Sequence, residues 1–493
     1  MATLTVRLDG TGTHTTIKAA VEAAVAGDTV QITQAGVYVE AGITVPANTI
    51  TVKATVPGVD ARIVSVASGS TLIVGATRTG VTWENFTLEA AAGSRLFSAG
   101  PSLTLRKMVV RLTDSQVGVY WSAVSLGVSL VDRCTFSMGR SDVAPQYFIS
   151  VDGAIGTGAM TLDVRASVFS TGSLTLTAGT AISFDPAAAN GAGAVVSLDN
   201  VTVRAVWRGF AVSATGLVRL RNCVYADAPT GGVAVYDNGS SGWLKDHATY
   251  CCLEGATLTG YPASNIAADP KFVAEDRGDF RLTAASPCRN AGTDLSAIFT
   301  LDRDGNAFGL GRGALEGEAS WDIGAYDSQL LGDYVTLRDL KEAKGDRWLT
   351  DTSDDAATST LDAAVAGAAV RKAEGLVNGY LASRYATPLD LSALPQAAVQ
   401  QVRHWVTCLA VYLLAVRRDR TDANVVEDHR HCLEELQAIR DGKLSLGGAT
   451  PRSGALPLHN HTTDGTEPYF TVTRTARGGA TIDKNEVGSL DLF

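Results

Sequence analysis

A short two-strand unit recurs through the middle of the chain and limits the folds open to it. Each copy alternates apolar and polar residues, passes a polar corner and continues as a second short alternating strand. The copies span residues 81–89, 103–112, 128–137, 161–170, 196–205 and 218–227. Irregularly spaced units of this kind stack as coils and bury their inward residues against the next coil, so they predict an all-β solenoid. The corner residues Asn85, Asn200 and Asn222 are expected to adopt a left-handed backbone or to bond the next coil.

Both ends of this region carry longer sequence patterns. The chain opens with D-G-T-G at 9–12, and G-D at 27–28 precedes a strand at 29–33 and G-V-Y-V-E at 36–40. Between them lies a short amphipathic helix with the apolar face Ile17, Ala20, Val21 and Ala24. Residues 269–327 contain D-P-K-F, D-F-R-L, S-P-C-R-N-A-G and W-D-I-G-A-Y-D. These patterns resemble right-handed parallel β-helix proteins of the pectin-lyase-like superfamily. The resemblance implies a β-helix over residues 1–327, with the first helix covering the open edge of the first coil.

Helical patterns replace strand patterns after Tyr326. A first helix is capped by Thr336 and Asp339 and ends at Gly345, and a second follows a Ser359/Asp362 capping pair. A third helix begins at Pro395 and ends near residue 418, and a fourth spans about 424–440. The short connections predict a compact four-helix bundle over residues 328–447. Residues 448–493 have no period and are predicted to form an extended arm, with a strand at 469–473.

The three longer helices each have a predicted apolar face. For the second helix it comprises Leu361, Val365, Ala369, Leu376, Tyr380 and Leu381. For the third helix it comprises Val399, Val402, Trp405, Val406, Leu409, Tyr412, Leu413 and Val416. For the fourth helix it comprises Val425, Val426, Cys432, Leu433, Leu436 and Ile439. Small residues between 363 and 368 are expected to allow another helix to approach closely.

Charge and cysteine content argue against several classes of function. The net charge is −10 and there is no basic block, which disfavours nucleic-acid binding as the main task. The longest apolar run, Trp405–Val416, is shorter than the ~20 residues that span a bilayer, and the first residues do not resemble a secretory signal. The seven cysteines lack C-x-x-C spacing, so we expect mostly buried thiols in a protein folded in the cytoplasm and predict no zinc site.

The helical part carries a second resemblance. Its motifs are Y-V-T-L-R-D-L at 334–340, L-T-D at 349–351, G-L-V-N-G-Y-L-A-S-R-Y-A-T-P-L at 375–389 and I-R-D-G-K-L-S-L-G at 439–447. Residues 334–448 resemble the Mu-type head–tail connector family of tailed bacteriophages, whose members are neck adaptor or head-completion proteins. The resemblance implies a structural protein of the virion neck, at the portal vertex, assembled in the host cytoplasm.

The same resemblance implies a set of partners. They are the portal protein, neighbouring copies in a ring, expected to be a dodecamer, and a downstream stopper or tail-terminator protein. Genomic DNA would pass through the ring without specific binding, and the β-helix would be displayed as a collar or decoration domain. The expected portal and ring contacts are Leu376, Tyr380, Arg384, Tyr385, Trp405, Tyr412, and Tyr469 and Phe470 on the arm. No membrane contact is expected.

An alternative function rests on carboxylates in the β-helix units. Glu84, Asp132, Asp163 and Asp199 occupy comparable places in successive units, and a hydrolytic pair needs two carboxylates about 5–9 Å apart. Asp163 and Asp199 are the candidates for a virion-attached glycan depolymerase, and a β-helix that binds host surface glycans without cleaving them is a further alternative. Solvated or corner-capping charges are the favoured interpretation, so no catalytic residue or cofactor is predicted.

Three short motifs carry residue types that can bind metal ions. The Asp302–Asn306 segment resembles part of a calcium loop, but its glycine is misplaced and a plain turn is favoured. His429 and His431 lie two apart on a predicted helix, so their side chains should point to different sides. His459 and His461 would share a face of an extended arm, where a solvated role is favoured over a metal site. No metal ligand is therefore predicted.

Overall fold

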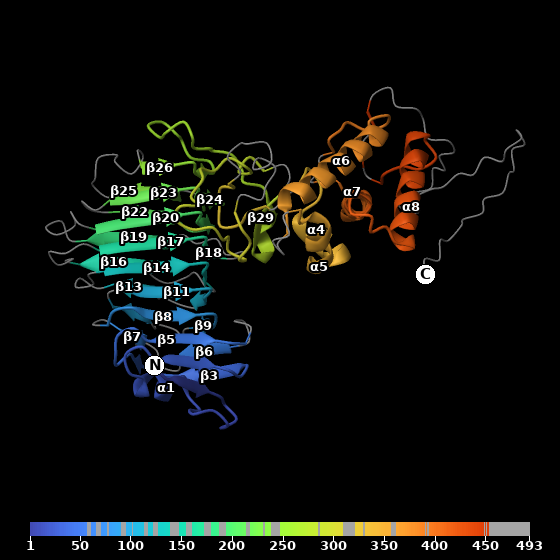
Figure 1. Ribbon diagram of the computed structural model, residues 1–493. Coiled ribbons are helices and arrows are strands. Elements are labelled where there is room, and N and C mark those ends of the chain that lie inside the picture. The colour runs from blue at the N-terminus through green and yellow to red at the C-terminus, as the bar shows by residue number, and fades with distance from the viewer. Residues whose placement is uncertain are drawn as a thin grey trace, which may run out of the picture. The chain divides into compact units, whose positions relative to one another are not determined.

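The computed structural model describes residues 1–452 apart from short gaps. The gaps are residues 57–60, 66–70, 76–77, 90–94, 101, 113–116, 122–126, 139–146, 154–159, 172–178, 187–193, 213–216, 230–231, 238–246, 284–285, 309–320, 329–330, 356–360, 390, 392–393, 448 and 450, and residues 453–493 are also not described. The chain separates into two compact units, Met1–Gln329 and Leu330–Phe493 (Figure 1).

The first unit is built mainly from three parallel sheets that run side by side along a stack of coils (Figure 1). Sheet A contains, in order, β1 (Thr3–Val6), β2 (Thr29–Ile32), β5 (Thr51–Ala54), β8 (Val81–Glu84), β11 (Leu103–Arg106), β14 (Gly127–Asp132), β17 (Met160–Arg165), β20 (Ala194–Asp199), β23 (Leu217–Arg221) and β26 (Ala248–Thr249). Sheet B contains β3 (Gly36–Glu40), β6 (Ala61–Ser65), β9 (Thr87–Glu89), β12 (Val109–Leu112), β15 (Thr135–Met138), β18 (Val168–Ser170), β21 (Thr202–Arg204), β24 (Val224–Ala226) and β27 (Cys252–Leu253). Sheet C contains β4 (Ile43–Thr44), β7 (Thr71–Val74), β10 (Arg95–Ala99), β13 (Val117–Trp121), β16 (Tyr147–Gly153), β19 (Thr180–Pro186), β22 (Arg208–Val212) and β25 (Val233–Asp237).

The chain order of the strands confirms the predicted parallel β-helix. Each coil passes from sheet A to sheet B to sheet C before the next coil begins, and strands pair in parallel with those of the neighbouring coils. All six units recognised in the sequence coincide with a sheet A strand followed by a sheet B strand. The alternation within each unit therefore sorted residues between the interior and the surface as expected.

A single left-handed residue turns the chain from sheet A to sheet B. In seven consecutive coils this residue has φ between 42° and 64°: Asn85, Lys107, Arg133, Ala166, Asn200, Asn222 and Tyr250. The left-handed backbone predicted for the corner asparagines is confirmed. Asn85 Nδ2 donates to the carbonyls of Ala54 and Val56 in the preceding coil, at 3.0 and 3.1 Å.

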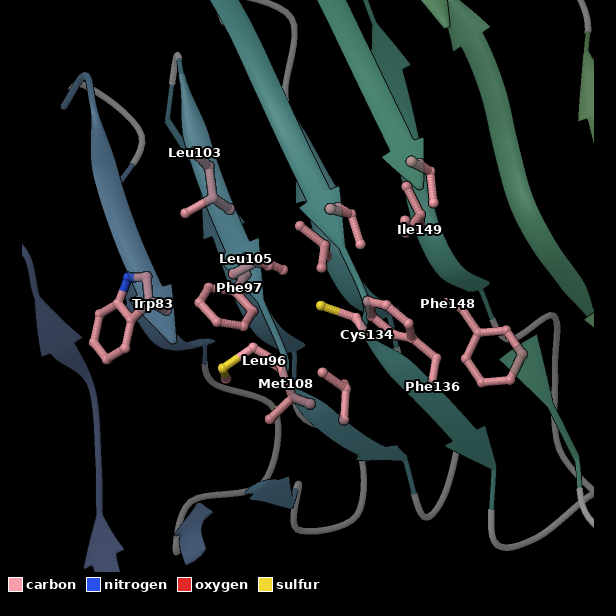
Figure 2. Packing of buried hydrophobic residues seen from close by; sticks show 14 of the residues in the cluster. Trp83, Leu96, Phe97, Leu103, Leu105, Met108, Cys134, Phe136, Phe148 and Ile149 are labelled. Carbon is pink, nitrogen blue, oxygen red and sulfur yellow. The ribbon is translucent and has the colours of Figure 1, made fainter. Parts of the chain in front are cut away.

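The interior of the β-helix is a set of stacked apolar columns (Figure 2). One column runs across sheet A in strict register, and each of its side chains is buried: Trp83, Leu105, Val131, Val164, Leu198 and Leu220. In sheet B, Phe136 and Phe169 are register neighbours whose rings stack with centroids 4.8 Å apart. Each buried side chain of this size contributes about 1.5–3 kcal/mol of burial free energy, so the columns dominate the stability of this unit.

Helix α1 (Ile17–Ala23) packs its buried residues Ile17, Ala20 and Val21 into the core of the first coils, as predicted. Thr16 caps it by accepting a hydrogen bond from Ala19 N at 3.2 Å. Glu40, the last residue of the G-V-Y-V-E pattern, accepts from Ile17 N at 2.9 Å. This buried carboxylate lies at the positive end of the helix and ties the helix to sheet B.

The closing segment of the β-helix lies along its A–B corners. It includes the antiparallel pair β28 (Phe272–Ala274) and β29 (Asp279–Leu282), joined by the 3-10 turn η2 (Glu275–Arg277). Asn200 Nδ2 donates to the carbonyls of Asp322 and Gly324, both at 2.8 Å. Asn222 Nδ2 donates to the carbonyl of Thr293 at 2.8 Å. The corner asparagines therefore hold the W-D-I-G-A-Y-D pattern in place.

Five helices lie in the described part of the second unit, one more than predicted. They are α4 (Leu337–Lys344), α5 (Asp346–Ser353), α6 (Ala363–Leu381), α7 (Gln396–Arg417) and α8 (Ala423–Arg440). Thr336 and Asp339 form the predicted capping box of α4, which ends at Gly345. Helix α5 was not predicted from the sequence.

Helix α6 buries a different face from the predicted one. At its start the Asp362 carboxylate accepts from Val365 N at 3.1 Å, while Ser359, the other member of the predicted capping pair, lies outside the described residues. The buried stripe is Ala366, Val370, Ala373, Val377 and Leu381, whereas Leu376 is 43% exposed. The stripe is rotated from the predicted face because two alanines and two valines, rather than the larger Leu376 and Tyr380, are buried against the rest of the unit.

The apolar faces predicted for α7 and α8 are largely confirmed. Val399, Val402, Trp405, Val406 and Leu409 are buried in α7, and Val425, Cys432, Leu436 and Ile439 are buried in α8. At the margins of these faces, Val416 and Val426 are 51% and 47% exposed. The predicted arm strand at 469–473 lies outside the described residues.

Candidate functional site

The outer face of sheet A carries a column of alternating charge. Successive strands place Lys53, Glu84, Arg106, Asp132, Arg165, Asp199 and Arg221 in register. Arg106 and Asp132 form an ion pair at 3.3 Å. Cross-strand pairs of opposite charge stabilise a sheet, so three of the four carboxylates considered for catalysis belong to a structural column.

Asp163 and Asp199 are both engaged by arginines. Asp163 stands two residues before Arg165 on β17 and accepts from its Nη2 at 2.7 Å. Asp199 is 1% exposed and accepts from Nε and Nη2 of Arg221, at 2.7 and 2.9 Å. Burial raises the pKa of the Asp199 carboxyl above its ordinary value, although Arg221 opposes the shift. Access of a glycan to Asp199 would require this bidentate pair to be opened.

The sequence motifs of the second unit meet around Tyr334. Its hydroxyl donates to Asn378 Oδ1 at 2.5 Å and accepts from Leu389 N at 2.7 Å, so the motif at 334–340 touches both ends of the motif at 375–389. Glu374 is buried and accepts from the backbone N–H groups of Asp333 and Tyr334, at 2.9 and 2.7 Å. Burial raises the pKa of the Glu374 carboxyl.

Tyr385 joins the same region to the end of the fourth motif. Its hydroxyl accepts from Leu446 N at 2.8 Å, and its backbone forms an antiparallel bridge with Pro451. The carbonyl of the neighbouring Arg384 accepts from Arg452 N at 2.7 Å. Three of the four motifs recognised in the sequence, at 334–340, 375–389 and 439–447, are therefore parts of one hydrogen-bonded framework, together with the start of the C-terminal segment.

The side chains expected to contact the portal or a neighbouring copy fall into three groups. Arg384, Tyr385 and Trp405 are 2%, 2% and 0% exposed and lie inside the unit, where they support its fold. Leu376 is exposed, and Tyr380 and Tyr412 are partly exposed. The remaining two, Tyr469 and Phe470, lie outside the described residues.

Helix α5 is attached to the end of α7 by arginines. Arg417 Nη1 donates to the carbonyl of Thr352 at 3.0 Å, and Arg420 pairs with Asp351 at 3.0 Å. Arg418 pairs with Asp355 at 2.9 Å. These tertiary contacts hold a short helix that has little intrinsic tendency to form alone.

A cluster that the sequence reasoning missed lies between α7 and α8. His404, Cys408 and Cys432 each offer a ligand atom, and these atoms lie within 4.8 Å of one another. Cys432 and the His404 ring lower the pKa of the Cys408 thiol to about 5 against the effect of burial. The Cys408 sulfur and burial together raise the pKa of the Cys432 thiol. The one sequence signal for this cluster is the spacing of His404 and Cys408, which lie one helical turn apart.

Two of the remaining motifs, His429/His431 and Asp302–Asn306, adopt the favoured geometry. His429 stacks on Tyr412 with ring centroids 3.7 Å apart, while His431 is exposed and lies 3.0 Å from Glu427. The two histidines thus point to different sides of α8. Asp302 closes a tight turn in which its carboxylate accepts from Asn306 N at 2.7 Å. His459 and His461 lie outside the described residues.

The strand order and the separate helical unit define the class of protein: a parallel β-helix joined to a small helical unit. Residues 334–459 match the family model described as Bacteriophage Mu, Gp36, which makes this a phage-related protein and suggests a structural one. No helix among the described residues is both long and apolar enough to cross a membrane.

The other comparisons add little. No curated protein matches the chain. A solved structure of pectin methylesterase from carrot is similar at 12% identity and a TM-score of 0.31, over 48% of this chain and 88% of that one. At these values the β-helix assignment stands on the strand order alone.

Proposed function

We propose that the chain is a neck adaptor of a tailed bacteriophage, which assembles as a ring on the portal and displays its β-helix as a collar or decoration domain. The observation that supports this most is the family match over 334–459, which falls on the unit whose motifs meet around Tyr334 and Tyr385. The resemblance of those motifs to head–tail connectors supplies the role in the neck. The net charge of −10 is compatible with DNA passing without being held.

The outer face of α6 suits contact with a neighbouring copy. Ala368, Gly375 and Gly379 are exposed on this helix, and a side chain added at either glycine would meet nothing within 4 Å. Leu376 supplies an exposed apolar contact beside them. A helix surface with small residues admits close approach of a second backbone, so we assign the ring interface to this face of α6, with Tyr380 and Tyr412 as further contacts.

Co-assembly with the portal protein of the same phage tests the proposal. The full chain should bind portal rings at a fixed stoichiometry, and Leu376→Asp should abolish ring formation while leaving the circular dichroism spectrum unchanged. Val426→Asp is the matched control, since Val426 is exposed to a similar degree on α8. A wild-type chain that never associates with portal rings would refute the proposed function.

The alternative, a β-helix that binds or cleaves host glycans, makes different predictions. Cleavage would release reducing ends from capsule or lipopolysaccharide, and binding alone would appear on a glycan array. Because Asp199 is buried and doubly bonded to Arg221, cleavage at this residue would require that pair to open. Glycan cleavage lost in Asp163→Asn or Asp199→Asn would instead favour the enzymatic function.

A further inference from the structure

The seam between α7 and α8 places three metal-ligating side chains together. His404 and Cys408 lie one turn apart on α7, and Cys432 faces them from α8. Their ligand atoms lie within 4.8 Å of one another, and Cys408 Sγ is 3.7 Å from each ring nitrogen of His404. The three residues differ in exposure, since Cys432 is buried, Cys408 is half-buried and His404 is exposed. An ion could therefore enter from the His404 side.

Contacts on both sides of the cluster fix the register of the two helices. Toward the start of α7, Trp405 Nε1 and Gln401 Nε2 donate to Glu435 at 2.6 and 2.8 Å. Toward its end, Tyr412 stacks on His429. These contacts show that the helices run antiparallel. They place Cys408 and Cys432 opposite each other, and none of them involves a proposed metal ligand. The donor atoms are thus positioned in advance.

The donor set and its spacing suit zinc. A tetrahedral site with Zn–S of about 2.3 Å and Zn–N of about 2.0–2.1 Å separates its sulfur and nitrogen ligands by about 3.6 Å. The 3.7 Å between Cys408 Sγ and the His404 ring nitrogens is close to that separation. Two thiolates and an imidazole favour Zn²⁺ over the hard cations, which prefer oxygen.

We propose that His404, Cys408 and Cys432 bind one Zn²⁺ ion that links α7 to α8. The fourth position would be taken by water or by Asp428, which stands one turn before Cys432 on the same face of α8. Because the ligands bind as thiolates and neutral imidazole, binding would displace the thiol protons and any proton on the imidazole. Because a metal that binds only the folded state stabilises it, the ion would strengthen the pairing of α7 and α8. This proposal does not depend on the role in the neck.

The test uses the full chain purified under reducing conditions. Elemental analysis should find one zinc per chain, and Co²⁺ added to the stripped protein should give the visible absorption of a tetrahedral thiolate site. His404→Gln and Cys408→Ser should each weaken Co²⁺ binding by at least about 100-fold, since even residues beyond the direct ligands cost 10–100-fold. His431→Gln is the matched control, because His431 is an exposed histidine on α8 outside the cluster. It should bind Co²⁺ as the wild type does.

Three results would overturn the proposal. The first is a reduced wild-type chain that gives no thiolate-type Co²⁺ spectrum, and the second is a His404→Gln variant that binds Co²⁺ as tightly as the wild type. The third is a chain that keeps a Cys408–Cys432 disulfide after purification under reducing conditions and so resists metal, which mass spectrometry would reveal as a loss of two hydrogens. If Co²⁺ bound instead to the buried cysteines of the β-helix, the thiolate absorption would persist in Cys408→Ser and His404→Gln. The variants therefore separate binding at the cluster from binding in the β-helix.

Discussion

Replacing Asn200 by glycine should release the closing segment from the side of the β-helix. Asn200 is 0% exposed, and its amide makes three hydrogen bonds. Two go to the carbonyls of Asp322 and Gly324, and the third is accepted from Asn222 Nδ2 at 3.1 Å. Glycine adopts the left-handed backbone at φ 51° without strain, so Asn200→Gly removes these bonds and little else.

The expected loss follows from the number of bonds. Each buried hydrogen bond contributes about 1 kcal/mol net, so three bonds amount to about 3 kcal/mol. Asn200→Ala should cost about 1 kcal/mol more, because alanine tolerates a left-handed backbone poorly. If the segment opens locally, only the two bonds to Asp322 and Gly324 are at stake, and a loss of about 2 kcal/mol corresponds to roughly 30-fold faster amide exchange there.

Hydrogen exchange read by mass spectrometry measures this directly. Peptides that cover residues 321–328 report the amides of Ile323 and Gly324, which bond to the carbonyls of Cys288 and Asn222. Lys107→Gly is the matched control, because Lys107 occupies the equivalent corner with an exposed side chain. Exchange in 321–328 that changes by less than about threefold in Asn200→Gly would refute the role given to the corner asparagine.

Three further predictions concern single contacts in the two units. Tyr385→Phe leaves the buried Leu446 N–H unpaired and should destabilise the helical unit by about 1–2 kcal/mol. The helical signal should then be lost at a lower denaturant concentration, and an unchanged midpoint would contradict this. Arg221→Met leaves Asp199 buried and unpaired and should lower the free energy of unfolding by about 3–5 kcal/mol. Adding Asp199→Asn should recover much of this loss, and a double variant no more stable than Arg221→Met would count against the pairing. Burial raises the pKa of Glu374 in the folded state, so its contribution to stability is full below about pH 4.5 and is lost as pH rises through the folded pKa. Glu374→Gln should therefore flatten the decline in stability as pH rises above about 4.5, and an unaltered slope would disprove that origin.

The β-helix could be predicted because its determinants are local. Alternation decides which residues face inward, and a single left-handed corner residue such as Asn85 or Asn222 decides where each coil bends. Stacking then sets the register, since each coil pairs with the next one in sequence. What alternation does not reveal is the charge on the outer face. In the sequence Glu84, Asp132 and Asp199 lie in separate units with no visible partner. The strand register places Arg106 between Glu84 and Asp132, and Arg165 between Asp132 and Asp199.

The helical unit was harder to predict in detail. The α6 sequence is rich in alanine and glycine, so the faces of this helix differ little in hydrophobicity. The buried face was therefore placed wrongly at the larger Leu376. Glu374 is buried because it bonds the N–H groups of residues 333 and 334, a tertiary contact without a periodic signal. Helix α5 depends on arginines more than 60 residues further along the chain.

The cysteine–histidine cluster shows the same limit at a candidate site. Sequence spacing places His404 and Cys408 on one face of a helix, but Cys432 reaches them only through the antiparallel register of α7 and α8. A search for C-x-x-C patterns therefore cannot find the cluster. By contrast, the motifs at 334–340, 375–389 and 439–447 were recognised as parts of one family, and the structure joins them through Tyr334 and Tyr385.

Examination of virions tests the central proposal most directly. Electron microscopy of the neck of the phage that encodes this chain, combined with mass spectrometry of the same particles, would locate the protein. The account predicts a ring of copies directly below the portal, with elongated projections large enough for the β-helix, and peptides from both units in mature particles. Absence of the chain from mature virions, or its presence only at a site away from the portal vertex, would contradict it.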